Sequence, residues 1–237
     1  MSLVVLTSLS PSPAAAERQR TCLATWRKAG LEVVSLNPPE ETLHVKGYGV
    51  HVQQVVRTGF ATYGRHVVPI NEFVSWVDDA KEPALLLNAD IELRMTRGQV
   101  QHLAELAAAG MPMVARVNHD PGMANARVEP AGFDGFVVSP RHCHLYAESF
   151  LSLGQPWWDY WVPWMALKAG EGLLLPREPV AFHLRHQGGW GWPTWTLGAR
   201  EFARLTGLYG GDDHAAYSRL SATAYTDIAA RAVRENL

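Results

Sequence analysis

A short apolar run that ends in a carboxylate is the feature that most constrains this chain. Residues Ala84–Leu87 are four apolar residues preceded by Pro83, too few for a helix and typical of a buried strand. Asn88 and Asp90 follow directly. Ligands of open α/β sheets bind at the carboxyl ends of strands, where a carboxylate can hold Mn²⁺ or Mg²⁺ on a phosphate. The alternative is that Asp90 only caps a turn or the next helix.

The opening of the chain predicts a parallel β-α-β unit. Residues 3–6 form an apolar run, residues 14–29 have a helical pattern ended by Gly30, and residues 31–36 form a second apolar run. Two such strands joined by a helix lie parallel with a right-handed crossover. The chain therefore starts as an α/β protein.

The remaining pattern continues this alternation without a linker or an internal repeat. Further strands are expected at residues 54–56, 66–68, 113–117, 136–138, 173–175 and 180–183, and helices at 70–80, 100–107, 146–153, 158–169, 197–205 and 217–233. We therefore expect one α/β domain with a mixed, mainly parallel central sheet flanked by helices.

Composition limits the classes of function. The 237 residues are 47% hydrophobic and 19% charged, as in a folded globular protein. A formal charge of −2 gives no general attraction to nucleic acid or anionic membrane. Two cysteines are too few for a disulfide framework and indicate a reducing, cytoplasmic compartment. No segment reaches the length of a signal peptide core or a membrane span.

Several segments resemble one enzyme family. The opening VVLTSLSPSPAAAERQRTCLATWRKAGLEVVSLNPPEE resembles the start of a GT-A type nucleotide-sugar glycosyltransferase of the family 2 kind. The NADI segment resembles the metal-binding Asp-x-Asp motif of that family, with Asn88 in place of the first Asp. Residues 132–136, GFDGF, resemble its later GxDxF strand. The resemblance covers residues 2–190, and the order and spacing of the motifs carry it.

The resemblance implies a fold, a donor and a metal site. It implies a single GT-A-like (Rossmann-like) domain over residues 1–237, with a nucleotide-binding part at about 1–95 and an acceptor and metal-completing part at about 96–237. The donor would be a nucleotide sugar held by Mn²⁺ or Mg²⁺. Asp90 would bind the metal, and a C-terminal histidine, first His183 and then His186, would complete its site.

Polar residues elsewhere are candidates to hold the nucleotide. In a fold of this kind the loop after the first strand faces the nucleotide, so Thr7, Ser8 and Ser10 are candidates to bind the base or ribose, although an ordinary polar loop is equally compatible. Asn88 offers a carbonyl oxygen near the metal. Arg185 can pair with phosphate as a bidentate donor. If residues 180–186 stay extended, Arg185 shares one strand face with His183, and His186 takes the other.

Two carboxylates are candidates for catalysis. Asp159 lies among tryptophans at an expected helix start, and desolvation there would raise its pKa, as suits a general base for an acceptor hydroxyl. The resemblance supports this role, because an acidic residue at a helix start does this work in similar inverting enzymes. The rival explanation is a helix N-cap without chemistry. Asp134 in the GFDGF segment is a candidate to orient the acceptor or sugar, or else a turn residue.

Alternative functions remain open at this point. The tryptophans clustered at residues 157–195 could stack on sugar rings in a non-catalytic carbohydrate-binding protein. A nucleotidyltransferase on a related fold would want a basic, glycine-rich loop after the first strand, and residues 7–13 contain no glycine. A zinc hydrolase lacks the expected histidine spacing. The acceptor could be a glycan, a lipid-linked sugar, a protein or hydroxymethylated DNA, and the oligomeric state is not predicted.

Overall fold

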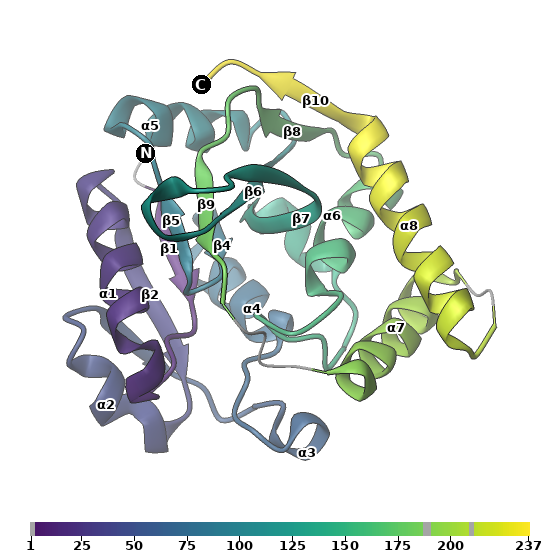
Figure 1. Ribbon diagram of the computed structural model, residues 1–237, viewed down its shortest axis with the longest axis horizontal. Helices are drawn as coiled ribbons and strands as arrows, with labels where there is room; N and C mark the ends of the chain where they lie inside the picture. The colour runs from purple at the N-terminus through teal and green to yellow at the C-terminus, as the bar shows by residue number, and fades with distance from the viewer. Residues whose placement is uncertain (1–2, 187–190, 209–210) are drawn as a thin grey trace.

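The computed structural model describes residues 3–186, 191–208 and 211–237, and it is an α/β domain built on one ten-stranded sheet (Figure 1). Neighbouring strands run in the order β10-β8-β6-β7-β4-β1-β2-β3, and β9 pairs with both β5 and β6. Six of the nine strand pairings are parallel, so the expected mixed, mainly parallel sheet is confirmed.

The bounds of the elements follow the chain in order. The strands are β1 (Val4–Thr7), β2 (Glu32–Asn37), β3 (His51–Gln54), β4 (Ala84–Leu87), β5 (Ile91–Leu93), β6 (Met111–His119), β7 (Arg127–Val138), β8 (Leu173–Pro176), β9 (Ala181–Leu184) and β10 (Ala232–Glu235). The helices are α1 (Pro13–Lys28), α2 (Thr42–Lys46), α3 (Phe60–Tyr63), α4 (Ile70–Ala80), α5 (Arg97–Leu106), α6 (Trp158–Lys168), α7 (Trp192–Thr206) and α8 (His214–Arg231), with 3-10 turns η1 (Pro39–Glu41), η2 (Pro121–Met123) and η3 (Pro140–Leu145).

The opening β-α-β unit forms as the sequence predicts. β1 pairs in parallel with β2 on one side and with β4 on the other. Pro13 suits the first turn of α1, where its missing N–H has no helical partner to lose, and Gly30 follows the helix at φ +84°. The parallel arrangement brings the carboxyl ends of β1 and β4 to the same edge of the sheet.

Both faces of the sheet are buried, which explains the continuous apolar strands. In β1, Val4 and Leu6 belong to the core under α4, α6, α7 and α8, whereas Val5 belongs to the core under α1 and α5. Successive side chains of a strand point to opposite faces, so a strand buried on both faces must be apolar throughout. The two cores also account for the opposite placement of α1 and α8 in Figure 1.

Four expectations about local structure were wrong. The strand expected at residues 54–56 forms earlier, at His51–Gln54. No strand forms at residues 66–68, and β10 replaces the expected end of the last helix. Residues 146–153 are not helical, because local hydrogen bonds compete with the helix. The Leu151 N–H donates to the Ser149 hydroxyl, and the Ser152 hydroxyl donates to the Phe150 carbonyl.

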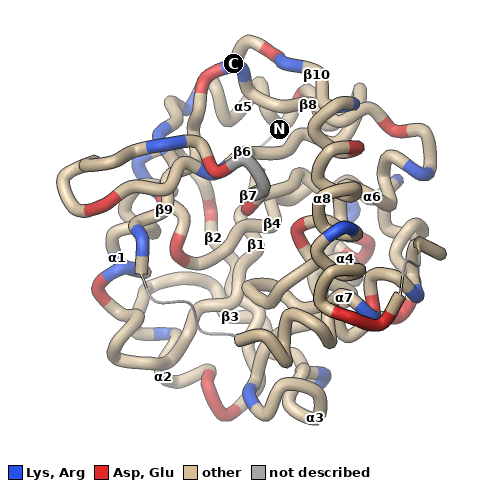
Figure 2. Tube along the Cα trace, turned by 45° about the vertical axis from the view of Figure 1, so that its right-hand side comes forward, with Lys and Arg blue, Asp and Glu red and all other residues tan. Residues whose placement is uncertain are grey.

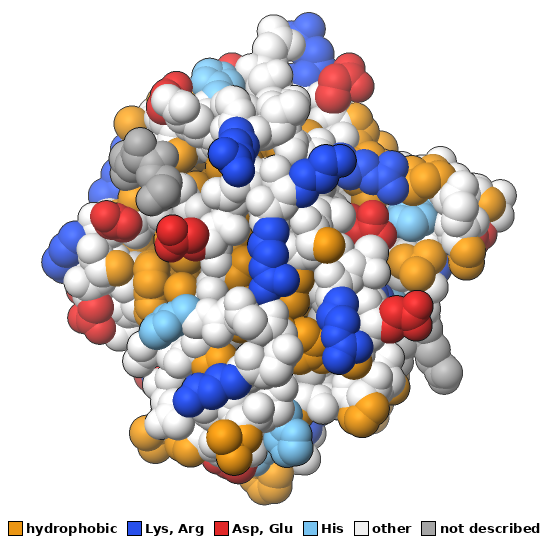
Figure 3. Space-filling model, turned by 90° about the vertical axis from the view of Figure 1, so that its left-hand side faces the viewer, with side chains coloured by type: hydrophobic (Ala, Val, Ile, Leu, Met, Phe, Trp, Pro, Cys, Tyr) orange, Lys and Arg blue, Asp and Glu red, His pale blue; other side chains and the backbone are white. Residues whose placement is uncertain are grey.

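Charge is distributed without a dominant patch on the faces shown. Acidic and basic residues are scattered over the chain (Figure 2). On the face toward α1 and α2, Lys and Arg side chains are spread among other types and form no single band (Figure 3). No helix within the described residues is long and apolar enough to cross a membrane. Cys22 and Cys143 are both free thiols.

Candidate functional site

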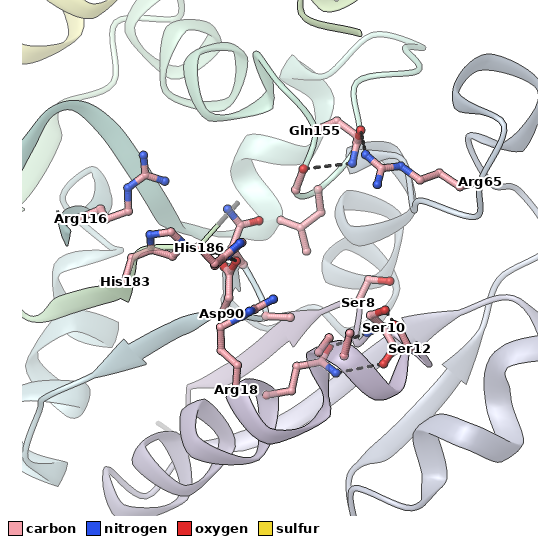
Figure 4. A pocket seen from close by; sticks show the side chains of 17 residues that line it. Ser8, Ser10, Ser12, Arg18, Arg65, Asp90, Arg116, Gln155, His183 and His186 are labelled. Carbon is pink, nitrogen blue, oxygen red and sulfur yellow. Dashed lines mark hydrogen bonds and ion pairs between the residues drawn. The ribbon is translucent and has the colours of Figure 1, made fainter. Parts of the chain in front are cut away.

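A cavity of about 730 Å³ opens at the carboxyl ends of β1 and β4, and we call it the central cavity. Ser8 and Ser10 from the loop after β1 line one end, Asp90 and His183 line another, and Arg65 lines a third wall (Figure 4). Its volume is that of a site for a ligand of nucleotide size. Residues from both halves of the chain therefore build one cavity at the sheet edge where ligands bind in such folds.

Three predicted metal ligands converge on this cavity, and we call them the metal triad: Asp90, His183 and His186. One ligand atom from each lies within 4.8 Å of the others. The His186 Nε2 is 2.9 Å and the His183 Nε2 is 3.5 Å from the Asp90 Oδ2, and the two Nε2 atoms are 3.2 Å apart. Figure 4 shows the three side chains meeting at one point.

The backbone explains how both histidines reach one point. We expected an extended segment in which His186 faces away from His183, and this was wrong. β9 ends at Leu184, and beyond it the His186 Nε2 lies 3.2 Å from the His183 Nε2, so the two rings reach the same side. Asp90 lies between β4 and β5, and β5 pairs with β9 so that Ile91 opposes His183. Sheet pairing thus fixes the carboxylate beside the first histidine.

The electrostatics of the metal triad keep the Asp90 carboxyl ionised. Burial raises the pKa of the Asp90 carboxyl, but hydrogen bonds and positive charge from His183 and His186 outweigh burial and hold that pKa well below its usual range. The carboxyl is therefore ionised at neutral pH. One carboxylate and two imidazoles suit Mn²⁺ better than Mg²⁺, which prefers oxygen ligands throughout. The residues present therefore fit a divalent transition metal.

Asp134 lies behind the cavity wall rather than in it. Its side chain is buried, and it accepts a hydrogen bond from the Asn88 amide and forms an ion pair with Arg116 at 2.8 Å. Burial raises the pKa of Asp134, while the Arg116 charge opposes that shift. Asn88 and Arg116 both line the central cavity. Asp134 is therefore placed to orient these two side chains, not to touch an acceptor or a sugar directly.

Asp159 has the electrostatic character expected of a general base. The pKa of Asp159 is raised to about 7, chiefly because the carboxyl is buried. The negative charge of Asp134 raises this pKa further, and the positive charge of Arg116 opposes the shift. The rival explanation, an N-cap, is wrong, because Trp157 occupies that position. Asp159 does not itself line the central cavity. The residue is half-buried rather than sealed in the core.

The backbone before Asp159 is strained. Trp157 has φ +80°, a left-handed conformation that a bulky residue adopts only when its surroundings enforce it. Its indole N–H donates to the Trp195 carbonyl, and its ring packs against Gly198, where an added Cβ would lie 2.8 Å from Cδ1. This packing against α7 sets the direction in which α6 presents Asp159.

The predicted nucleotide-binding residues divide into two groups. Ser8, Ser10 and Asn88 line the central cavity as expected. Thr7 is fully buried and does not line it, so the expected contact of Thr7 with a base or ribose is not available. The loop after β1 is held by Gln19, which donates to the Ser10 carbonyl and accepts from the Ser10 N–H.

Arg185, expected to pair with phosphate, lies outside the lining of the central cavity. Its guanidinium pairs with Asp120 at 3.1 Å and donates to the Asn125 carbonyl, away from the central cavity. Three other arginines line the cavity instead: Arg18, Arg65 and Arg116. The position of Arg18 one turn into the helix after the first strand was a signal for it, whereas Arg65 and Arg116 reach the cavity only through the tertiary structure.

The tryptophans expected to stack on sugars are mostly structural. Trp157, Trp158 and Trp161 are buried in the core. Trp192 is half-exposed, but His214 and Trp195 stack against its ring at centroid distances of 3.8 and 4.7 Å. Trp164 is partly buried against the same core, and Trp190 lies outside the described residues. Among the described tryptophans none lines the central cavity, so the carbohydrate-binding alternative has no support from these rings.

Comparisons with known proteins give distant similarities of fold. No protein-family model and no curated protein matches the sequence. A Bacillus anthracis protein described as a glucose-1-phosphate thymidylyltransferase, in complex with sucrose, is 10% identical with a TM-score of 0.46, covering 95% of this chain and 96% of that one. Rv0371c of Mycobacterium tuberculosis, in complex with manganese, is 11% identical with a TM-score of 0.44, covering 88% and 100%.

A third similar structure is the 2-C-methyl-D-erythritol 4-phosphate cytidylyltransferase of Thermus thermophilus. It is 18% identical with a TM-score of 0.36, covering 88% of this chain and 98% of that one. Scores this low assign no family and no activity to this chain. The functional argument therefore rests on the residues of the central cavity and the metal triad.

Proposed function

We propose that this protein is a transferase that binds a nucleotide sugar with Mn²⁺ and moves the sugar to an acceptor hydroxyl with inversion. The single observation that supports this most is the convergence of Asp90, His183 and His186 at one end of a nucleotide-sized cavity. A bound Mn²⁺ would stabilise negative charge on the departing diphosphate. Residues of the central cavity come from both parts of the chain: the nucleotide-binding part at about 1–95 and the metal-completing part at about 96–237.

In this proposal the chain supplies three further functions. Ser8 and Ser10 bind the base or ribose, and Arg18 pairs with a phosphate oxygen. Asp159 accepts the proton of the acceptor hydroxyl while the acceptor oxygen bonds to the anomeric carbon. The bond from that carbon to the diphosphate oxygen breaks, so the nucleoside diphosphate leaves with the electron pair. A base with a pKa of about 7 is partly ionised and still a good proton acceptor at neutral pH.

Nucleotidyl transfer is the second candidate. Two of the similar structures carry names of that activity. An observation within the cavity also favours it: Arg18, Arg65 and Arg116 line its walls, and a nucleoside triphosphate would offer these donors more phosphate oxygens than a diphosphate does. The absence of glycine from residues 7–13 speaks against it. In this reaction the leaving group is pyrophosphate rather than a nucleoside diphosphate.

One experiment tests the proposal and separates the two reactions. The protein is incubated with Mn²⁺ and UDP-, GDP-, CDP- or TDP-sugars, with candidate acceptors, and free nucleoside diphosphate is measured. In parallel, nucleoside triphosphates and sugar 1-phosphates are supplied and pyrophosphate is measured. We expect nucleoside diphosphate that is absent with EDTA and returns with Mn²⁺. Pyrophosphate as the sole product would establish nucleotidyl transfer instead, and full activity in excess EDTA would refute the metal role.

A matched pair of variants ties this result to the metal triad. Asp90→Asn keeps the shape but removes the charged ligand, and we expect turnover to fall at least about 100-fold, since the metal supplies several kcal/mol of charge stabilisation. Glu92→Gln is the control, because Glu92 lies two residues away and contacts Arg94 outside the cavity. Equal loss in both variants would contradict a specific role for Asp90.

A further inference from the structure

A chain of hydrogen bonds leads away from the metal triad into the β6–β7 hairpin. The His183 Nδ1 is 3.0 Å from the Asn118 Oδ1, and the Asn118 Nδ2 donates to the Glu129 Oε2 at 2.7 Å. Asn118 and His183 are register partners in the parallel pair of β6 and β9, so the backbone holds them side by side. Glu129 lies on β7.

The order of these groups determines where the histidine proton lies. An ionised Glu129 can only accept hydrogen bonds, so the NH₂ group of Asn118 must face it. The amide oxygen of Asn118 then faces His183, and an oxygen can only accept. The Asn118 oxygen therefore favours a proton on the Nδ1 of a neutral His183. The lone pair is then on Nε2, where the His186 Nε2, 3.2 Å away, can donate to it, and the Asp90 Oδ2 at 3.5 Å is the acceptor that competes for the proton.

This tautomer is the one that a metal site requires. The Nε2 of His183 is the atom that faces Asp90 and His186. When the lone pair is on Nε2, this nitrogen can bind a divalent cation without first losing a proton. A hydrogen bond at the second ring nitrogen also orients the ring and makes the ligand more basic.

We propose that Asn118, held in one orientation by Glu129, is a positioning residue that fixes the Nδ1–H tautomer of His183 and so prepares Nε2 for a divalent cation. The inference rests on the proposed function for the identity of the metal site. The tautomer itself is a property of the metal-free protein and can be measured there.

The first test is the tautomer of His183 in the metal-free protein at a pH where the ring is neutral. Two-bond ¹H–¹⁵N correlation spectra distinguish a proton on Nδ1 from one on Nε2. We expect Nδ1–H in the native protein and a loss of that preference in Asn118→Leu, which removes the acceptor at similar size. An Nε2–H ring in the native protein, or an unchanged Nδ1–H ring in Asn118→Leu, would overturn the inference.

The second test is Mn²⁺ affinity by isothermal titration calorimetry. We expect Asn118→Leu to weaken binding about 10- to 100-fold, the usual effect of losing such a partner. Val128→Ala, a half-exposed apolar position in the same hairpin, should leave affinity unchanged. Weakening by the control as well would show that the hairpin, not the amide, is responsible.

A double variant tests the direction of the hydrogen bonds. In Asn118→Asp the new carboxylate still accepts from His183 but meets Glu129 as a like charge. Adding Glu129→Gln replaces that repulsion with an amide that donates to the carboxylate. We expect the double variant to recover the Mn²⁺ affinity and the Nδ1–H tautomer of the native protein. Failure of both to recover, in a protein with native thermal stability, would overturn the proposed chain of donors and acceptors.

The outcomes separate this inference from the proposed function. A native protein that binds Mn²⁺ while Asn118→Leu binds it equally well overturns the positioning role and leaves the metal site intact. A native protein that binds no divalent cation overturns the proposed function and the metal part of the inference together, whatever the tautomer spectra show.

Discussion

Replacing Asp159 with Asn should make the protein more stable and less active. The folded protein holds this carboxyl at a pKa of about 7, against 3.8 for an ordinary aspartate. Each unit of pKa corresponds to about 1.4 kcal/mol, so about three units place an upper limit of about 4 kcal/mol on the free energy spent in keeping the charged form buried. Asn has the same shape and no charge, and it removes this cost.

The gain in stability should depend on pH. Because the folded protein binds this proton more tightly than the unfolded chain does, the native protein loses stability as pH rises from about 4 to about 7. The advantage of Asp159→Asn should therefore grow from about 1.5 kcal/mol at pH 5 to at most about 4 kcal/mol at pH 8.

Urea denaturation at pH 5 and pH 8 measures these free energies of unfolding. Asp79→Asn, an exposed position on α4, is the control for removing one negative charge. In the same samples turnover should fall about 10²- to 10⁴-fold, the usual contribution of a general base, with Mn²⁺ affinity unchanged. Native turnover should rise with pH through about 7. A stability difference that is the same at both pH values, or a less stable variant, would refute the argument that a desolvated carboxylate lies here.

Three further predictions concern the walls of the central cavity. Arg18→Ala should raise the Kd for a nucleotide roughly tenfold without changing Mn²⁺ affinity, measured by calorimetry, because Arg18 lines the cavity and its Nε has no hydrogen-bond partner among the described residues. Arg185→Ala should change the Kd for the nucleotide by no more than about twofold. A tenfold higher Kd would indicate that Arg185 does bind a phosphate. Gly198→Ala should lower the free energy of unfolding by about 1–3 kcal/mol in urea, since its Cβ would lie 2.8 Å from Trp157; an unchanged midpoint would contradict the close packing.

Local sequence patterns were sufficient for most of the regular structure. The helix Ile70–Ala80 and the strand Ala84–Leu87 form at the expected residues, because apolar spacing and flanking prolines act over a few residues. Thr96 caps α5 with a capping box, as its position before a helical pattern indicates. The helix expected at residues 146–153 does not form, because the hydroxyls of Ser149 and Ser152 make hydrogen bonds with nearby backbone groups that compete with the helix.

The sequence by itself determined the chemical types available at the site: a carboxylate at the end of a buried strand, two nearby histidines and an aspartate among aromatic residues. The tertiary structure alone decided how they are used. The tertiary structure brings His186 to within 2.9 Å of Asp90, and the pairing of β6 with β9 puts Asn118 against His183. Burial of Asp159 on α6, beside Asp134 and Arg116, sets its charge state. Strand pairing and desolvation join residues that are far apart in the chain, so no local pattern records them.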